Sequence, residues 1–267
     1  KRISENNRKQ KQLGHYFGGI FAYEGECYWN IDRLPFLEER LIALGANKFN
    51  RPSILERTPS TDKLQPIISG MTLEVIFSAR SPYSYLALPQ LIEFRKKFPV
   101  KIVYRPILPM VMRGMTINRE KQLYIVHDCK RVADKKGIPF GNIADPLGKA
   151  VERCYSLFQH VQENGKEEEY FSTFLKAVWA EGQHGYLTKT LKNIVEKIGL
   201  NWQEAKTKLD NNEWHQIIEK NRQALYAQGK WGVPTMILKN QNEETVLSVW
   251  GQDRIWLIEE EIHKMNS

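Results

Sequence analysis

The sequence has 267 residues, of which 42% are hydrophobic and 26% charged, and its formal net charge is +8. This content is enough for one large core, or for one domain plus a fragment. No apolar run approaches the roughly 20 residues that span a bilayer, and the basic stretch 1–12 is not followed by the apolar segment of a secretory signal. We therefore expect no membrane association.

The positive charge is scattered along the chain, with clusters in 1–11 and 130–136. Two interpretations are open: solvated helix faces with a frayed end, or attraction for anionic ligands. Neither a zinc-finger spacing nor an aromatic RNA-binding signature accompanies the charge, so we expect no nucleic acid partner.

Cysteine usage indicates a reducing compartment, and we predict a cytoplasmic protein. The three cysteines, Cys27, Cys129 and Cys154, are far apart, odd in number and form no C-x-x-C motif. This spacing argues against a disulfide framework and against a zinc ribbon. The histidines show no metal-ligand spacing either, so no metal is expected.

An internal repeat is the most informative feature of the organisation. Residues 5–8 (ENNR) match 219–222 (EKNR) at an offset of 214, and 29–33 (WNIDR) match 250–254 (WGQDR) at an offset of 221. The second copy is therefore longer by seven residues, and we place the extra residues in the polar hairpin 239–244.

The repeat predicts three regions. Residues 1–45 match the C-terminal part of a domain whose complete version occupies 71–267. Residues 46–70 are polar and rich in Pro and Ser, which is typical of a linker. At one position the first copy differs from the second, because Ile20 aligns with Pro234.

The complete domain is predicted to contain a strand, a helix and a strand, then a long helical stretch, then two strands and a helix. Alternating β-branched residues indicate the strands, and apolar positions at helical spacing indicate the helices. The expected elements are a strand at 73–77, a helix opening at 81–82, a strand at 100–104, helices through about 117–228, strands at 235–238 and 246–249, and a helix from Asp253.

This order is the α/β layout of a thioredoxin-like fold with an inserted all-helical subdomain, here at about 112–229. A partial second thioredoxin-like unit at 1–45 precedes it. Two kinds of association are open at this point: a homodimer, and pairing with the missing part of the first thioredoxin-like unit.

Five motifs occur in order in the complete domain. They are 77–86 with its Ser-Pro-Tyr-Ser turn, 121–128, 177–182 (AVWAEG), 232–235 (GVPT) and 250–254 (WGQDR). Together they resemble the family of 2-hydroxychromene-2-carboxylate isomerases and kappa-class glutathione transferases, with a DsbA-like thioredoxin fold. The resemblance implies glutathione as cofactor or cosubstrate. The family's usual acidic residue after the first strand is replaced by Ser78, so the resemblance does not give the substrate.

Ser81 has two interpretations. Serine is a good helix N-cap, and Pro82 is a good first helical residue. Alternatively, the hydroxyl donates a hydrogen bond to the glutathione sulfur, where a helix N-terminus favours a thiolate. Ser84 stands where a redox relative would have its resolving cysteine, and a serine pair cannot exchange disulfides. We therefore predict that this turn is not that of a disulfide oxidoreductase.

Further contacts with glutathione are implied by the resemblance. Val233 and Pro234 form either an ordinary strand entry or a cis-proline turn whose backbone pairs with the cysteinyl part of glutathione. Gln252 and Asp253 open the last helix, and Asp253 either pairs with the α-amino group or is only an N-cap. Lys121 either pairs with a glutathione carboxylate or is a solvated lysine. Because isoleucine disfavours a cis bond, we expect only the complete unit to bind glutathione.

Tyr83 and Trp179 are candidates for the wall of a substrate pocket, although Trp179 is also typical of a core residue. We predict a glutathione-dependent isomerase or transferase that acts on a small aromatic electrophile, with Ser81 stabilising the thiolate. The alternative is a non-catalytic thioredoxin-like binding or scaffold module. The intact motifs favour the enzyme, whereas the incomplete first copy favours the module.

Overall fold

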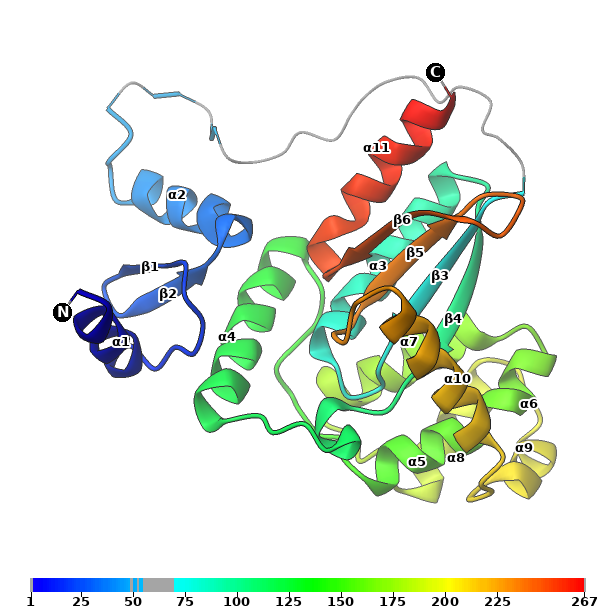
Figure 1. Cartoon of the computed structure of the whole chain (residues 1–267). Coiled ribbons are helices and arrows are strands. Elements are labelled where there is room, and N and C mark those ends of the chain that lie inside the picture. Colours follow the sequence, from blue (N-terminus) through cyan, green and yellow to red (C-terminus); the bar gives the residue numbers. More distant parts are fainter. Residues whose placement is uncertain (1, 49, 52, 55–69, 267) are drawn as a thin grey trace. The chain divides into compact units, whose positions relative to one another are not determined.

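The computed structural model describes residues 2–48, 50–51, 53–54 and 70–266. The chain divides into two compact units (Figure 1): unit 1 is Lys1–Asp62 with Ile117–Ile125, and unit 2 is Lys63–Thr116 with Val126–Ser267. Most of the predicted linker lies outside the described residues. Among the described helices, none is both long and apolar enough to cross a membrane.

A four-stranded mixed sheet forms the centre of unit 2. Its strands lie in the order β4 (Lys101–Pro106), β3 (Thr72–Phe77), β5 (Thr235–Lys239), β6 (Thr245–Trp250). β3 runs parallel to β4, and β5 runs antiparallel to both β3 and β6. All four predicted strands are confirmed, with ends that differ from the prediction by at most two residues.

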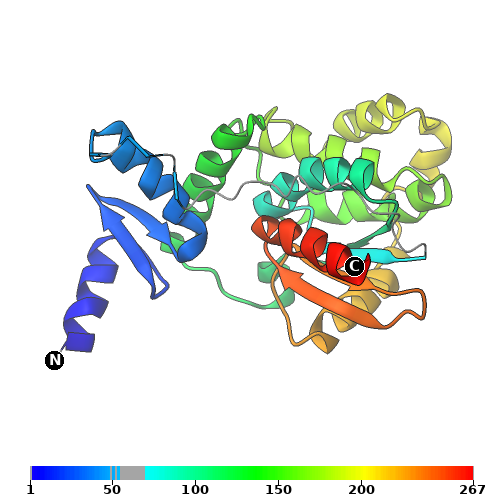
Figure 2. The ribbon, with the colours of Figure 1, turned by 90° about the horizontal axis from the view of Figure 1, so that it is seen from above.

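Helices cover both faces of this sheet. α3 (Pro82–Lys97) and α11 (Ile255–Asn266) lie on one face, and α10 (Trp214–Ala227) lies on the other (Figures 1 and 2). On the α3 face, the ring centroids of Phe77 and Phe171 lie 4.5 Å apart. On the α10 face, Ile76 packs with Leu225. The predicted thioredoxin-like fold is thus confirmed.

Glu74 is an unusual residue for a central strand, since only 4% of it is exposed. Cations from the two neighbouring strands pair with it: Lys239 Nζ lies 3.0 Å from Glu74 Oε1, and Arg105 contacts the same oxygen. A buried carboxylate requires such partners to offset its lost hydration.

The segment between β4 and β5 is helical, as predicted. Its helices are α4 (Arg119–Lys136), α5 (Lys149–Ser156), α6 (Phe158–Glu163), α7 (Glu167–Trp179), α8 (Thr188–Lys197), α9 (Trp202–Lys208) and α10. Buried aromatic side chains fill its core, among them Tyr155, Phe158, Tyr170, Phe171 and Phe174. The division between the two units passes through α4, after Ile125.

Unit 1 has the same element order as the end of unit 2. Its elements are α1 (Arg2–Gln12), β1 (Ile20–Tyr23), β2 (Glu26–Trp29), the 3-10 turn η1 (Ile31–Arg33) and α2 (Leu34–Ala43). Their counterparts are α10, β5, β6, the 3-10 turn η3 (Gln252–Arg254) and α11. That unit 1 is the remnant of a tandem domain stays a prediction.

The first turns of α4 pack with unit 1, although the sequence placed them in the helical insertion of the complete domain. Trp29 N donates a hydrogen bond of 3.2 Å to the Tyr124 hydroxyl. The Tyr124 ring also contacts that of His15, with 4.5 Å between centroids. This contact explains why the segment 117–125 belongs to unit 1.

Equivalent backbone hydrogen bonds correct the repeat alignment at one point. Asn30 N donates to Gly19 O, and Gly251 N donates to Pro234 O, each at 2.9 Å. Gly19 is therefore the counterpart of Pro234, and the predicted alignment with Ile20 was wrong by one residue. The true offset is 215 here, and the hydrogen bonds that end α1 and α10 match at the same offset. A loop has no periodicity that would set its alignment, which explains the error.

Candidate functional site

The strand register of unit 2 brings four connecting segments to one end of the sheet. Phe77 pairs with Pro106, so the segments after β3 and after β4 begin at the same level. Thr235 pairs with Ile76 on one side and with Trp250 on the other. The segments that meet there are 78–81, 107–116, 231–234 and 251–254. The predicted Ser81, Val233–Pro234 and Gln252–Asp253 positions are therefore on the same edge of one sheet.

Ser81 is the N-cap of α3, and its Oγ accepts a hydrogen bond of 3.2 Å from Ser84 N. Pro82 follows at the first helical position. The capping bond uses a lone pair of the oxygen, so the hydroxyl hydrogen is left to donate. Ser81 is half-buried, and the first turn of α3 contains no acidic residue. An anion at this helix end would therefore meet a hydroxyl donor and a positive partial charge.

Buried hydrogen bonds hold the turn that carries Ser81. Ser84 Oγ accepts from Ser78 N at 3.4 Å. The Tyr155 hydroxyl accepts from Ala79 N at 2.9 Å and donates to Ile107 O at 2.8 Å. Burial raises the pKa of Tyr155, which keeps its hydroxyl protonated in both roles. Tyr155 thus joins the segment after β3 to the segment after β4.

Tyr83 is half-buried, and its side chain has a specific partner. Its hydroxyl donates a hydrogen bond of 2.7 Å to Asp128 Oδ2. Asp128 is fully buried on α4, and Arg131 Nη1 lies 3.3 Å from its other oxygen. The orientation of Tyr83 is therefore fixed by a hydrogen bond to Asp128, which is itself ion-paired with Arg131.

The segment before β5 is held on several sides. The Val233–Pro234 peptide bond is cis, as the resemblance implied. Thr235 Oγ1 donates to Gly232 O at 2.8 Å. Arg113, from the segment after β4, donates through Nη2 to Trp231 O at 3.1 Å. A side-chain contact thus joins this loop to the segment after β4.

Gln252 and Asp253 differ in their surroundings. Only 2% of Gln252 is exposed, and its Oε1 accepts from Gln90 Nε2 at 2.7 Å. Asp253 is half-buried in η3. The N-cap of η3 is Gly251, and α11 begins at Ile255 rather than at Asp253 as predicted. The interpretation of Asp253 as an N-cap is therefore wrong, because a 3-10 turn separates it from the helix.

Trp179 and Lys121 lie in other environments. Trp179 is 5% exposed, and its ring stacks on that of Phe140 with 5.9 Å between centroids. Such burial is typical of a core residue. Lys121 belongs to unit 1, where its Nζ lies 5.5 Å from the centroid of the Tyr16 ring and 5.8 Å from that of Phe17. Burial lowers the pKa of Lys121. Its contact with glutathione stays a prediction.

Three residues of this region were missed by the sequence analysis: Gln90, Arg113 and Tyr155. Each lies within a helix or 3-10 turn and belongs to no motif. Their roles depend on contacts with distant segments, so no local pattern could have found them.

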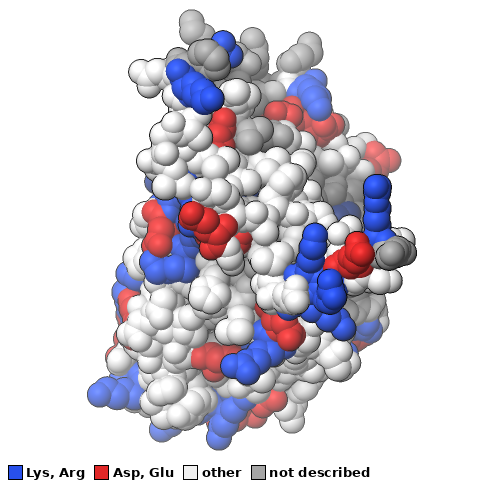
Figure 3. Space-filling model, turned by 90° about the vertical axis from the view of Figure 1, so that its left-hand side faces the viewer, with Lys and Arg blue, Asp and Glu red and all other residues white. Residues whose placement is uncertain are grey.

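On the face shown in Figure 3, basic and acidic side chains are interspersed with uncharged surface. Within the described ranges, no cluster of three or more His, Cys, Asp and Glu residues is arranged to hold a metal ion.

Residues 72–263 match the family described as the DSBA-like thioredoxin domain. A 2-hydroxychromene-2-carboxylate isomerase from Pseudomonas putida is 25% identical over 197 residues, which cover 71% of this chain and 93% of the relative. The solved structure of a 2-hydroxychromene-2-carboxylate isomerase is 24% identical, with a TM-score of 0.60, over 73% of this chain and 95% of that one. The cytosolic disulfide reductase DsbM from Pseudomonas aeruginosa is 16% identical, with a TM-score of 0.56, over 73% and 100%.

Proposed function

The chain belongs to the DSBA-like thioredoxin domain family, and we propose that its unit 2 is a glutathione-dependent isomerase or transferase that acts on a small aromatic electrophile. One observation carries this proposal: the half-buried Ser81 hydroxyl caps α3 and still has its hydrogen to donate. The similarity to a 2-hydroxychromene-2-carboxylate isomerase supports the isomerase reaction.

The groups at this end of the sheet fit glutathione. Ser81 offers a donor to the sulfur, the backbone at Val233 offers peptide groups to the cysteinyl residue, and the half-buried Asp253 offers a carboxylate to the α-amino group. The buried side chain of Gln252, which is hydrogen-bonded to Gln90, would help to hold the neighbouring Asp253 in place. Bound glutathione would supply a nucleophilic thiol at this position.

The contribution that Ser81 must make is modest. A free thiol has a pKa near 8.5, and lowering it by one or two units requires about 1.4–3 kcal/mol of preferential stabilisation of the thiolate. A hydrogen bond to a charged acceptor together with a helix N-terminus can provide this amount. The absence of acidic residues from the first turn of α3 leaves this effect unopposed there.

We further propose that this turn does not perform dithiol exchange. Both positions of the redox pair are serines, Ser81 and Ser84. The cysteines at 27, 129 and 154 are all buried, and burial raises the pKa of Cys154. A raised pKa disfavours the reactive thiolate.

A second candidate function is a non-catalytic binding or scaffold module. The observation that favours it is unit 1, which repeats the closing elements of unit 2 but has Gly19 where unit 2 has Pro234. Binding of glutathione at millimolar concentration to unit 2, followed by a test of turnover, distinguishes the two functions.

The test compares three variants of Ser81 that separate capping from donation. Ser81→Thr keeps both, Ser81→Asp keeps the cap but cannot donate to a thiolate, and Ser81→Ala loses both. The pKa of the bound glutathione thiol is measured from the pH dependence of thiolate absorbance. We expect it to be lowered in the unmodified protein and in Ser81→Thr, and to rise by about one unit in Ser81→Ala and by more in Ser81→Asp.

Turnover of 2-hydroxychromene-2-carboxylate, measured with and without glutathione, tests the isomerase reaction. Turnover should require glutathione and fall in Ser81→Ala and Ser81→Asp. If Ser81→Asp retains full turnover, Ser81 is only a cap. If the unmodified protein binds no glutathione at millimolar concentration, the enzyme proposal fails and the module remains.

A further inference from the structure

β1 and its counterpart β5 have different neighbours. β5 is an internal strand that pairs with β6 on one side and with β3 on the other. Within the described ranges, β1 pairs with β2 alone. The edge of β1 that corresponds to the β3 edge of β5 therefore presents backbone groups without a strand partner in this part of the chain. Such an edge is a template for an added strand.

The helices α2 and α11 show the same contrast. At the offset of 221, Leu34, Leu37 and Leu41 of α2 correspond to Ile255, Ile258 and Ile262 of α11. The three isoleucines are buried, with exposures of 5%, 0% and 0%, between the sheet and α3. No residue of α2 is buried. The apolar stripe has been kept in unit 1, but no helix equivalent to α3 covers it within the described residues.

On β1, the strand face that corresponds to the buried Met236 face of β5 is exposed at Phe21. Phe21 pairs with Tyr28, and Tyr28 is buried. The counterpart of Phe21 at the offset of 215 is Met236, which pairs with Val75 of β3. Phe21 is 45% exposed, whereas Met236 is fully buried. In unit 2 the strand β3 and the helix α3 close this layer.

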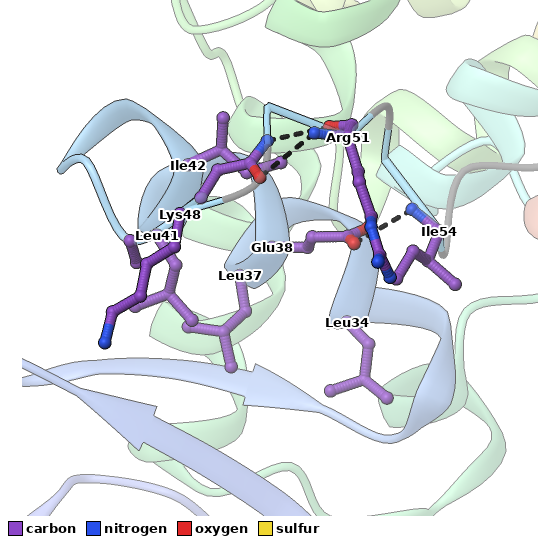
Figure 4. A pocket seen from close by; sticks show the side chains of 10 residues that line it. Leu34, Leu37, Glu38, Leu41, Ile42, Lys48, Arg51 and Ile54 are labelled. Atoms are coloured by element: carbon purple, nitrogen blue, oxygen red, sulfur yellow. Dashed lines mark hydrogen bonds between the residues drawn. The ribbon is translucent and has the colours of Figure 1, made fainter.

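A groove of about 460 Å³ lies along α2 (Figure 4). Leu34, Leu37 and Leu41 line it from the helix, and Ile54 lines it from the segment that follows. Glu38 accepts a hydrogen bond of 2.9 Å from Ile54 N. The leucines of α2 thus form the apolar base of the groove, and the chain segment at Ile54 forms one side of it.

Glu38 indicates which element of unit 2 this groove corresponds to. Its counterpart is Glu259 of α11, whose Oε1 lies 3.9 Å from Nζ of Lys97 in α3. The side of α2 that carries Glu38 is therefore the side that α3 covers in unit 2. The groove therefore corresponds to the place of α3 in unit 2, and the edge of β1 that has no strand partner within the described residues corresponds to the edge of β5 that pairs with β3.

We propose that unit 1 is a docking surface for a strand–helix segment of the same polypeptide, which pairs antiparallel to β1 and lays an amphipathic helix along α2. β3 and α3 show how such a segment covers the equivalent surfaces, since β3 pairs antiparallel to β5. Chain order identifies the source: in unit 2 the segment β3–α3 precedes α10, so its equivalent would precede α1. This inference is independent of the proposed catalytic function of unit 2.

Hydrogen exchange tests the proposal. The 267-residue chain is compared with the polypeptide encoded by its whole natural reading frame, called here the extended polypeptide. We expect the amides of β1 and α2 to exchange at least tenfold more slowly in the extended polypeptide, while those of β5 and α11 serve as an unchanged internal reference. Leu37→Asp, within the groove, should abolish this protection. Leu44→Asp is the matched control, since Leu44 is 58% exposed and does not line the groove.

Three outcomes would overturn the proposal. One is a natural reading frame that encodes no strand–helix pattern before Lys1. Another is equal exchange of β1 and α2 in the two polypeptides. The third is protection in the 267-residue chain that grows with protein concentration, which would identify a second copy as the occupant.

Discussion

Gln90 and Gln252 are 162 positions apart in the sequence, yet Gln90 Nε2 donates a hydrogen bond of 2.7 Å to Gln252 Oε1. Lys136 Nζ lies 3.5 Å from the same oxygen. Gln90 belongs to the helix that Ser81 caps, and Gln252 precedes Asp253. This bond therefore connects the two ends of the proposed glutathione site through the interior of unit 2.

Gln252→Leu should destabilise the folded protein by about 1 kcal/mol, because the half-buried Gln90 Nε2 would lose one of its two acceptors and keep only Leu86 O. The measurement is the free energy of unfolding in urea. Gln241→Leu makes the same change at an exposed hairpin position and should have little effect. Equal effects of the two substitutions would show that the bond to Gln90 contributes nothing to stability.

Gly232→Ala should disturb the loop before β5. A Cβ at this position would lie 2.5 Å from Trp250 Nε1, which is far inside van der Waals contact. We expect a loss of about 1–3 kcal/mol in the free energy of unfolding, together with weaker binding of glutathione, measured by calorimetry.

Two further variants check the cause of this effect. Gly18→Ala is the matched control, because a Cβ there meets no atom within 4 Å and its φ is not in the left-handed region. Combining Gly232→Ala with Trp250→Ala should restore most of the lost stability, since Trp250 is 44% exposed and contributes little core packing. Failure of this combination to recover stability would exclude the clash as the cause.

Tyr85 should make stability depend on pH in the alkaline range. Burial, with a smaller contribution from Glu181, raises its pKa from 10.0 to about 12. Below pH 10 the phenol is neutral in both the folded and the unfolded chain, so its stabilising contribution is complete. Between pH 10 and about 12 the unfolded chain loses the proton while the folded chain keeps it, and the free energy of unfolding falls.

Tyr85→Phe should therefore reduce this fall, by at most about 1.4 kcal/mol per pH unit. The measurement is urea unfolding at several pH values between about 9 and 11.5. Some pH dependence should persist, because burial also raises the pKa of Tyr155 and Tyr170. At neutral pH the variant loses only the 2.7 Å hydrogen bond to Pro139 O. An unchanged slope would contradict the assignment to Tyr85.

Much of the fold followed from local sequence patterns. The strands β3 to β6 were predicted within two residues, because alternation and β-branched residues identify strands without reference to distant parts of the chain. The helical character of the insertion followed from apolar spacing in the same way. The Ser81-Pro82 turn was identifiable because an N-cap followed by proline is itself a local signal.

Contacts between distant segments were not predictable in this way. Trp179 was a candidate for a pocket wall, which stays a prediction; its stacking on the half-buried Phe140 could not be foreseen from the sequence. Lys121 was expected to contact glutathione, and this stays a prediction; its neighbours Tyr16 and Phe17 in unit 1 could not be foreseen from the sequence. A motif specifies which residue types occur together in the sequence. The burial of each residue and its contacts depend instead on which helices and strands pack against it.

The sequence by itself determined that a thioredoxin-like domain follows a segment similar to its own closing elements, and that serines stand at both positions of the Ser-Pro-Tyr-Ser turn where a redox relative has cysteines. Periodicity, capping residues and internal similarity are properties of the chain that need no tertiary contact. Only the tertiary structure decided that Gly19 stands at the position of Pro234 and that Gln90 donates a hydrogen bond to Gln252. It also revealed that α2 keeps an apolar stripe on which, in the described part of the chain, no helix packs as α3 packs on α11. These features arise from hydrogen bonds and packing between segments far apart in the chain, which local patterns do not specify.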